Sequence, residues 1–193
     1  INHRINTLEY YMFGYEDDAD KKRFMFSPLG NLFLKYINDE DKLVRIFATM
    51  LYAIQFQHPA SGTDKEFQLY PFRLIFKLLL DERLDGKLYN YEYAQILAFV
   101  TSVDETVYET LVEKILELRN KSVDEIKATY KSDEHTYVNA VYEWEYYTCK
   151  LLSTVGILNA EKGEPICKLF HPTRTGSNSA PTGRTARNGY VTL

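Results

Sequence analysis

The sequence predicts a mainly α fold with short β-hairpins, which places the chain in the α+β class. Apolar residues recur at helical spacing over most of the chain. Apolar residues make up 45% of the 193 positions and aromatic residues 15%, which is enough to fill real cores. In addition, a helix followed by a strand, a polar tip and a second strand occurs twice, which is typical of hairpins attached to helices.

The first copy of this pattern opens the chain. The segment Asn2–Phe13 has helical periodicity, and Gly14 is expected to cap its C-terminus. A charged stretch with its tip at Asp17–Asp20 and a short aromatic run at Arg23–Phe26 then predict a hairpin.

The middle of the chain is predicted to be helical. Ser27 before Pro28 favours an N-cap followed by the first helical position, so a helix of one or two turns should run to Tyr36. Later helices are expected at Asp41–His58, from Pro71 to near Gly86, from an Asn90 cap to Val100, from an Asp104 cap onward, and from the Ser122–Glu125 capping box.

The second copy of the pattern closes the chain. The expected features are a long helix from Ser132 or Asp133 to Val155, a Gly156 cap, a strand over Ile157–Phe170 with a turn at Lys162–Gly163, a mobile loop over Pro172–Asn188, and a strand at Tyr190–Leu193 that pairs across the loop.

A helix followed by a hairpin is also how a winged helix ends. We therefore predict tandem winged-helix-like subdomains. Residues 1–60 would hold the C-terminal part of the first together with a linker helix, and residues 61–193 would hold a second, helical one that ends in a wing hairpin.

Composition narrows the class of protein. No run of about 18 apolar residues occurs, so no membrane span is expected. The first residue, Ile1, and the lack of a signal peptide suggest a trimmed fragment. Cys149 and Cys167 form neither a CxxC motif nor a disulfide framework, so we expect a reducing, cytoplasmic setting in a bacterium.

Charge is distributed unevenly. The whole chain has a formal charge of -4, yet residues 149–193 contain six basic and two acidic residues. A basic stretch acts locally, within a Debye length of about 8 Å, and can therefore meet phosphates on an otherwise acidic chain. A solvated loop is the alternative explanation for these charges.

Several short segments carry a family resemblance. Phe26–Gly30 resembles the strand and "T/S-x-x-G" segment that follows the wing in many winged-helix proteins. This segment and three later ones occur in an order that is similar to that in the AlwI-type family of type IIS restriction and nicking endonucleases. The similarity runs from Gly14 to Glu125 and continues more loosely from Tyr137. The later segments are Ala53–Phe56, Tyr70–Phe72 and Asn90–Tyr93.

The resemblance implies a monomeric DNA-recognition part that reads a short asymmetric site in double-stranded DNA. It also implies a covalently linked nuclease domain, absent here, that uses a divalent metal such as Mg²⁺. The family's carboxylate and lysine motif occurs here only in helices or turns, so we expect no catalytic residue and no metal or cofactor in this chain. These chance matches are Asp20–Lys22, Glu40–Lys42, Asp85–Lys87 and Glu125–Lys127.

Candidate DNA contacts follow from the two copies. The start of each helix before a hairpin would face base edges, where Arg reads guanine and Asn reads adenine; these residues are His3, Arg4, Asn6, His135, Thr136 and Asn139. Basic residues in and near the hairpins would contact phosphates; these are Lys21, Lys22, Arg23, Lys150, Arg174, Arg184 and Arg187.

Two other classes of protein fit the same pattern. A winged-helix transcription regulator would share these features but would act as a symmetric dimer on a pseudo-palindromic site. A helical protein-interaction module is favoured by the acidic first 148 residues, including Asp39–Asp41. The helix-start residues named above could also be exposed without touching DNA.

Overall fold

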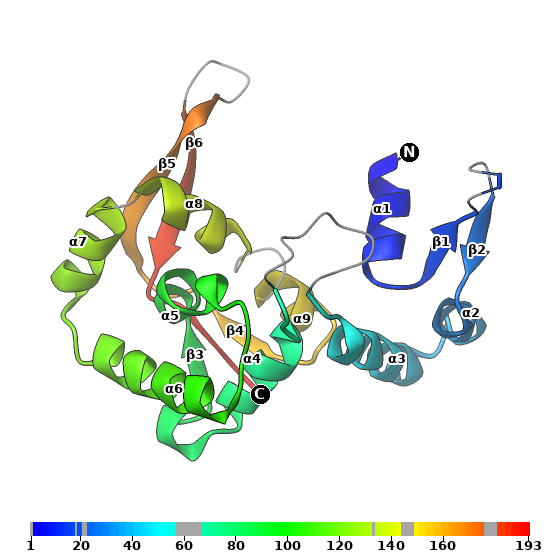
Figure 1. The fold of residues 1–193 in the computed structure, drawn as a ribbon, viewed down its shortest axis with the longest axis horizontal. Coiled ribbons are helices and arrows are strands. Elements are labelled where there is room, and N and C mark those ends of the chain that lie inside the picture. Colours follow the sequence, from blue (N-terminus) through cyan, green and yellow to red (C-terminus); the bar gives the residue numbers. More distant parts are fainter. Residues whose placement is uncertain are drawn as a thin grey trace. The chain divides into compact units, whose positions relative to one another are not determined.

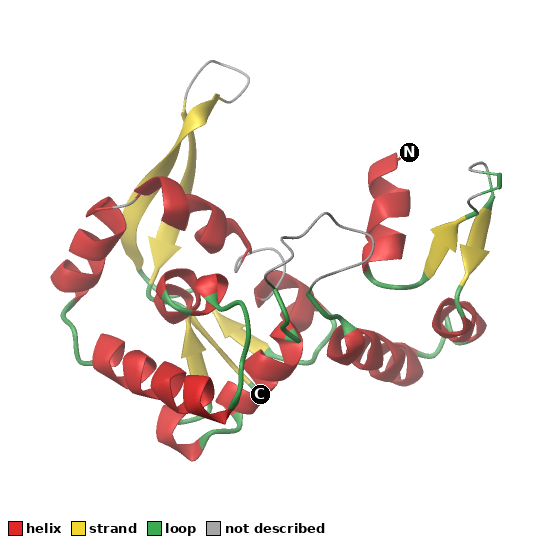
Figure 2. Ribbon diagram, in the orientation of Figure 1, coloured by secondary structure: helices red, strands yellow, loops and turns green. Residues whose placement is uncertain are grey.

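The computed structural model describes residues 2–17, 19–20, 23–56, 67–132, 134–143, 149–175 and 181–193. It is a mixed α/β structure with small antiparallel sheets, as Figures 1 and 2 show. Two compact units are present, residues 1–76 and residues 77–193, and the division falls within helix α4 (Pro71–Leu79). The predicted boundary at residue 60 lies outside the described residues.

The first unit is built from helices around a small hairpin. Strand β1 pairs antiparallel with β2, with Gly14 opposite Phe26, so the first predicted hairpin is confirmed. The elements are α1 (Asn2–Tyr10), β1 (Gly14–Glu16), β2 (Phe24–Phe26), α2 (Pro28–Lys35) and α3 (Glu40–Ala53).

The turn from α1 into the hairpin differs from the prediction. Met12, and not Gly14, takes the left-handed conformation, with a φ of 57°. Gly14 is the first residue of β1 and is needed for a different reason: a Cβ there would lie 2.3 Å from the carbonyl oxygen of Met25. The glycine signal was therefore real, but it marks close backbone contact within the hairpin.

Ser27 caps α2, as predicted. Its Oγ accepts a hydrogen bond from the Gly30 N–H at 2.9 Å and donates to the Met12 carbonyl at 2.7 Å. The α2 helix thereby joins the turn that follows α1. Gly30 packs directly against the Phe13 backbone, because an added Cβ would lie 1.9 Å from the Phe13 carbonyl oxygen.

Helix α3 ends earlier than predicted. Asp39 caps its start, but the helix stops at Ala53, because Ile54 is extended and Phe56 forms an antiparallel bridge with Leu69. The two backbone hydrogen bonds of this bridge are 2.7 and 2.9 Å long. His58 lies outside the described residues.

The second unit combines helices with two antiparallel sheets, in the orders β3-β7-β4 and β5-β6. Its elements are η1 (Glu82–Leu84), β3 (Lys87–Tyr89), α5 (Asn90–Gln95), η2 (Leu97–Phe99), α6 (Glu105–Arg119), α7 (Val123–Ser132), α8 (Glu134–Glu143), α9 (Lys150–Thr154), β4 (Asn159–Glu161), β5 (Pro165–Thr175), β6 (Pro181–Arg187) and β7 (Tyr190–Thr192).

Most helices in this unit begin where the sequence predicts. Asp104 caps α6 through the Val107 N–H at 2.8 Å, and Ser122 with Glu125 forms the predicted capping box before α7. The exception is α5, which already begins at Asn90. The Asn90 N–H donates to the Gly189 carbonyl at 2.9 Å, so this residue connects α5 to the start of β7.

A buried ion pair holds the centre of the second unit. Glu92 is fully buried, and its carboxylate accepts from the Arg119 Nε at 2.6 Å. Arg119 also donates to the carbonyls of Leu84 and Lys87, each at 2.8 Å. One guanidinium thus joins the end of α6 to η1, β3 and α5. Burial raises the pKa of Glu92, although the hydrogen bond from Arg119 opposes this shift.

The C-terminal segment overturns one prediction. Pro172–Asn188 is not a loop: its described residues include the end of β5 and all of β6. The expected long helix is described as two helices, α8 and α9, and residues 144–148 between them lie outside the description. Gly156 and Gly163 have the positive φ values expected of a cap and a turn.

The strand at Tyr190–Thr192 is confirmed, but it has more partners than predicted. It pairs with β4 across β5 and β6, and also with β3, so that it is the central strand of its sheet.

Candidate nucleic-acid interface

Strands β5 and β6 form a two-stranded ribbon, which we call the ribbon from here on. Cys167 lies opposite Ala186, Lys168 opposite Thr185 and Phe170 opposite Gly183. A bulge between Pro165 and Cys167 bends β5 near its start. Figure 1 shows that the ribbon extends beyond α7 and α8.

One side of the ribbon is part of the hydrophobic core. Leu169 is 1% exposed and Ala186 is fully buried, and both belong to a cluster with residues of α5, α7 and α8. Figure 2 shows these helices gathered around one half of the ribbon. The ribbon is therefore a supported element, whereas an isolated two-stranded hairpin would be only marginally stable.

The other side of the ribbon faces away from these helices. Because side chains alternate along a strand, the neighbours of Leu169 and Ala186 project from the opposite face. Lys168 is exposed and Phe170 is 40% exposed, with the Lys168 Nζ 5.3 Å from the centre of the Phe170 ring. Thr185 and Arg187 project from the same face. We call these four residues the outward face.

Gly183 contributes no side chain to the outward face. A Cβ at this position would lie 3.1 Å from the Lys168 Cε and 3.3 Å from the Phe170 Cδ1. Both distances are shorter than most Cβ contacts, so a Cβ at this position would require the two side chains to shift by a few tenths of an ångström. The absence of a side chain lets the lysine stem and the aromatic ring lie close to the backbone of β6.

The ionised side chains of the two ribbon strands are all positively charged. Neither strand contains Asp or Glu, whereas together they contain the four cations Lys168, Arg174, Arg184 and Arg187. Arg174 lies on β5, and its side chain is outside the description. The electrostatic potential of such a surface acts over about a Debye length. A ribbon without acidic residues can therefore attract a polyanion although the chain is acidic overall.

Arg184 and Arg187 do not share a face. Arg184 is opposite Leu169 in the register and therefore lies on the helix-covered side, where it is half-buried. Its Nη1 donates to its neighbour's carbonyl, Gly183 O, at 3.3 Å. Arg187 projects from the outward face, and its Nη1 donates to the Gly163 carbonyl at 3.3 Å.

The candidates in the first unit are only partly described. His3, Arg4 and Asn6 lie on α1, but their side chains are outside the description, as are Lys21 and Lys22 altogether. Arg23 is exposed just before β2, and its N–H donates to the Asp20 carbonyl at 2.8 Å.

The base-reading candidates of the second unit lie on α8, which is not the helix directly before the ribbon. Thr136 is half-buried, and the side chains of His135 and Asn139 are outside the description. Helix α8 buries Val138 and Val141 in the cluster beneath the ribbon. The helix before Gly156 is α9, where Lys150 is exposed.

Sequence reasoning missed Lys168 and Phe170. The signal for them is the alternation along the strand. Cys167 and Leu169 are the less exposed positions, and Lys168 and Phe170 are the exposed ones, as expected for a strand with one buried face. The same alternation that predicts the strand also places Lys168 and Phe170 on its exposed face.

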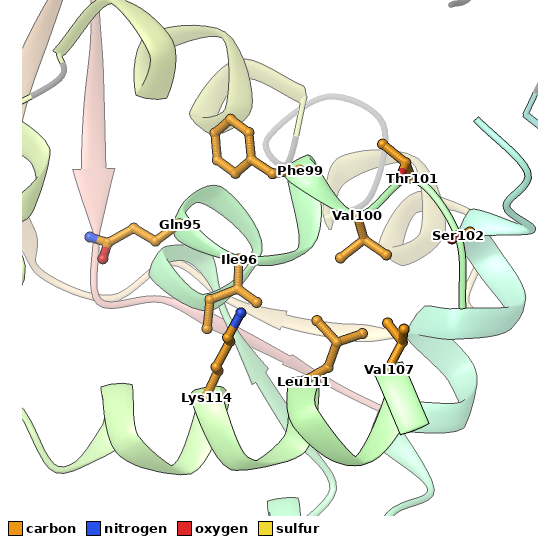
Figure 3. Close-up of a pocket in the computed structure, with 9 residues that line it drawn as sticks. All are labelled: Gln95, Ile96, Phe99, Val100, Thr101, Ser102, Val107, Leu111 and Lys114. Carbon is orange, nitrogen blue, oxygen red and sulfur yellow. The ribbon is translucent and has the colours of Figure 1, made fainter. Parts of the chain in front are cut away.

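A hollow of about 380 Å³ is a second surface feature of this unit. Figure 3 shows its residues between η2 and α6, with Lys114 reaching toward Ile96 and with Gln95 at one side. Most of its described lining is apolar, and the described lining residues include no carboxylate, histidine or cysteine. The polar groups of this lining are the Gln95 amide, the hydroxyls of Thr101 and Ser102, and the Lys114 ammonium group.

Within the described ranges, no three His, Cys, Asp or Glu side chains come together in a way that could hold a metal ion. No helix in the same part of the chain has both the length and the apolar character needed to cross a membrane. The motif matches at Glu40–Lys42 and Glu125–Lys127 lie within α3 and α7, as expected.

Comparisons with known proteins identify the class as type II restriction enzymes. A family model described as "Type II restriction endonuclease HgaI, N-terminal domain" matches residues 1–193. A curated relative, "Type II restriction enzyme HgaI" from Avibacterium volantium, is 50% identical over 194 residues, which cover 100% of this chain and 40% of the relative. No solved structure matches the chain.

The chain therefore belongs to the family of N-terminal domains of type II restriction endonuclease HgaI. It spans 40% of the length of the curated relative. These findings support the restriction-enzyme class that the sequence resemblance implied, and they do not specify the AlwI-type family.

Proposed function

We propose that this chain is the sequence-specific recognition domain of a type II restriction endonuclease and that it binds double-stranded DNA. The observation that carries the proposal is the supported ribbon, whose strands contain four cations and no acidic residue. Phosphate contacts supply most of the non-specific affinity for DNA, and they need such a locally basic surface.

The parent enzyme would be of the type IIS or nicking kind and would act as a monomer on an asymmetric site. A covalently linked nuclease domain would supply the cleavage chemistry with a divalent metal such as Mg²⁺. The length of the curated relative leaves room for such a domain, because the chain covers 40% of it.

Each unit would act as a winged-helix-like subdomain. In the first unit, α1 would present His3, Arg4 and Asn6 to base edges, with Lys21, Lys22 and Arg23 near phosphates. In the second unit, α8 would present His135, Thr136 and Asn139. Lys150, Arg174, Arg184 and Arg187 would be its phosphate contacts.

Selection of bound duplexes from a random-sequence pool, at moderate salt, tests this function. Enrichment of one short asymmetric motif supports a recognition domain of the proposed kind. A palindromic motif would instead indicate a dimeric regulator, and sedimentation would then show a dimer. No enrichment by a folded chain would overturn DNA recognition and leave protein interaction as the function.

Arg184→Ala is an informative variant because of its position. As a phosphate contact, Arg184 would contribute about one unit to the slope of log affinity against log salt, equally for all duplexes. As a packing residue beside Leu169, it would affect unfolding and leave that slope unchanged. Measuring both quantities separates the two roles.

A further inference from the structure

We propose that the outward face of the ribbon lies in the DNA major groove, with Phe170 against base edges and with Lys168 and Arg187 on the flanking phosphates. The inference rests on the proposed function, because it assumes that the chain binds duplex DNA. It adds two contact residues, Lys168 and Phe170, and a direction of approach to that function.

The dimensions of the ribbon favour this groove. The major groove is about 12 Å wide and admits a two-stranded β-ribbon, whereas the minor groove of undistorted B-DNA, about 6 Å wide, must be widened to admit one. Strand β5 has 11 residues. Its register with β6 is broken between Phe170 and Thr175, so the paired length follows the 7 residues of β6, which is roughly 23 Å at about 3.3 Å per residue, or about two thirds of a turn of B-DNA. Figure 1 shows that the ribbon extends beyond its supporting helices.

The composition of the outward face also fits a groove. Phe170 is 40% exposed although its neighbour Leu169 is 1% exposed, so the ring lies on the side away from the core. Apolar side chains contact the thymine methyl group in the major groove. Lys168 and Arg187 supply positive charge on the same face, and Thr185 between them can donate to or accept from either kind of base edge.

Gly183 provides the shape that this contact needs. Phe170 and Gly183 are opposite each other in the register, and no side chain rises from Gly183 beside the ring. Since an added Cβ would lie 3.3 Å from the Phe170 Cδ1, a larger residue would require the ring to shift by a few tenths of an ångström. The face is thus low enough on the β6 side for a base pair to approach.

The test uses the whole chain and two duplexes of equal length, one carrying the motif selected from the random pool and one with that motif scrambled. Phe170→Ala should weaken binding to the selected duplex about 5- to 20-fold, within the range of one base contact. It should leave the scrambled duplex and the salt slope unchanged. Lys168→Ala should weaken both duplexes alike and lower the slope by about one.

Two matched variants control for exposure. Phe99 is 47% exposed on η2 of the same unit, and Lys131 is exposed at the end of α7. Phe99→Ala and Lys131→Ala should leave both affinities unchanged. Phe170→Leu should retain more of the specific affinity than Phe170→Ala, and unfolding curves should show that all variants are folded.

Methylation interference determines the groove. Methyl groups on guanine N7 lie in the major groove and those on adenine N3 in the minor groove. Interference at guanine N7 that disappears in Phe170→Ala supports the proposal. Interference confined to adenine N3, or a selected duplex bound equally by wild type and Phe170→Ala, overturns it. If the pool yields no motif at all, the proposed function itself fails.

Discussion

The two hairpins of this chain follow the same sequence pattern but have different structures. Each strand of the β1–β2 hairpin has three residues, whereas β5 and β6 have 11 and 7. The short hairpin is held by local contacts: the Glu16 N–H donates to the Glu9 carboxylate at 2.8 Å. The ribbon instead buries Leu169 and Ala186 under three helices. In this chain the hairpin with the longer strands is the one whose residues are buried under three helices, although the same sequence pattern predicts both.

The hairpins also differ in charge. The tip of the first contains three aspartates, Asp17, Asp18 and Asp20, beside Lys21, Lys22 and Arg23. Its charges cancel locally. The ribbon strands contain no acidic residue, so the ribbon offers the stronger field to a polyanion. We therefore expect the second hairpin to contribute more to DNA affinity than the first.

The largest expected effect comes from breaking the buried ion pair at the centre of the second unit. Arg119→Ala leaves the Glu92 carboxylate fully buried without its cation, and breaking such a pair costs about 3 to 5 kcal/mol of unfolding free energy. Urea unfolding of the whole chain measures it. Arg83→Ala, which removes an exposed arginine paired with Asp81 and Glu109, is the control and should have a much smaller effect. Equal effects of the two variants would contradict a central role for Arg119.

A smaller effect should appear in the first hairpin. Gly14→Ala forces a Cβ to within 2.3 Å of the Met25 carbonyl oxygen, and relief of such a clash costs about 2 to 3 kcal/mol. Gly156→Ala has open space around it but a φ of 71°, so about 1 kcal/mol is expected. If the ribbon dominates binding, Gly14→Ala changes duplex affinity less than twofold under conditions where the chain stays folded. A large loss of affinity would show that the first hairpin matters as much.

The third effect is smaller and depends on pH. Hydrogen bonds from the Arg83 guanidinium hold the pKa of Asp81 well below its ordinary value of 3.8, and the Tyr108 hydroxyl adds a bond of 2.9 Å. Because the folded state lowers this pKa, the stabilisation is fully present above about pH 4 and is lost as the pH falls below it. Asp81→Asn should therefore cost about 1 kcal/mol at pH 7. The difference from wild type should shrink below pH 4, as unfolding at a series of pH values would show. A difference in unfolding free energy that stays constant with pH would contradict this role of the Asp81 carboxylate.

Sequence predicted the features that depend on local chemistry. The caps at Ser27, Asp104 and Ser122 were located correctly, because a side-chain oxygen before a helix acts on its own first turn. The first hairpin was also predicted from local chemistry, namely a charged tip at Asp17–Asp20 beside a short aromatic run at Arg23–Phe26. Its turn residue was not, since Met12 adopts a conformation that glycine would favour and is held there by the contacts of Ser27.

The ribbon could not be predicted because its stabilisation is not local. Pro172–Asn188 is rich in Ser, Thr, Gly and Arg and has no apolar periodicity, which is typical of a loop. Its strand β6 pairs Ala186 with Cys167, and Ala186 joins Leu169 and residues of the α8 helix in one buried cluster, which brings together distant parts of the sequence. The basic residues were identified from composition, but their distribution over two faces required the register.

The central claim is that the ribbon, more than the first hairpin, contacts the phosphates of duplex DNA. The most direct test is the salt dependence of duplex binding by wild type, Arg187→Ala and Arg23→Ala. We predict that Arg187→Ala lowers the slope of log affinity against log salt by about one, and that Arg23→Ala lowers it by less than half as much. An unchanged slope for Arg187→Ala together with a full loss for Arg23→Ala would contradict the claim and assign the phosphate contacts to the first hairpin.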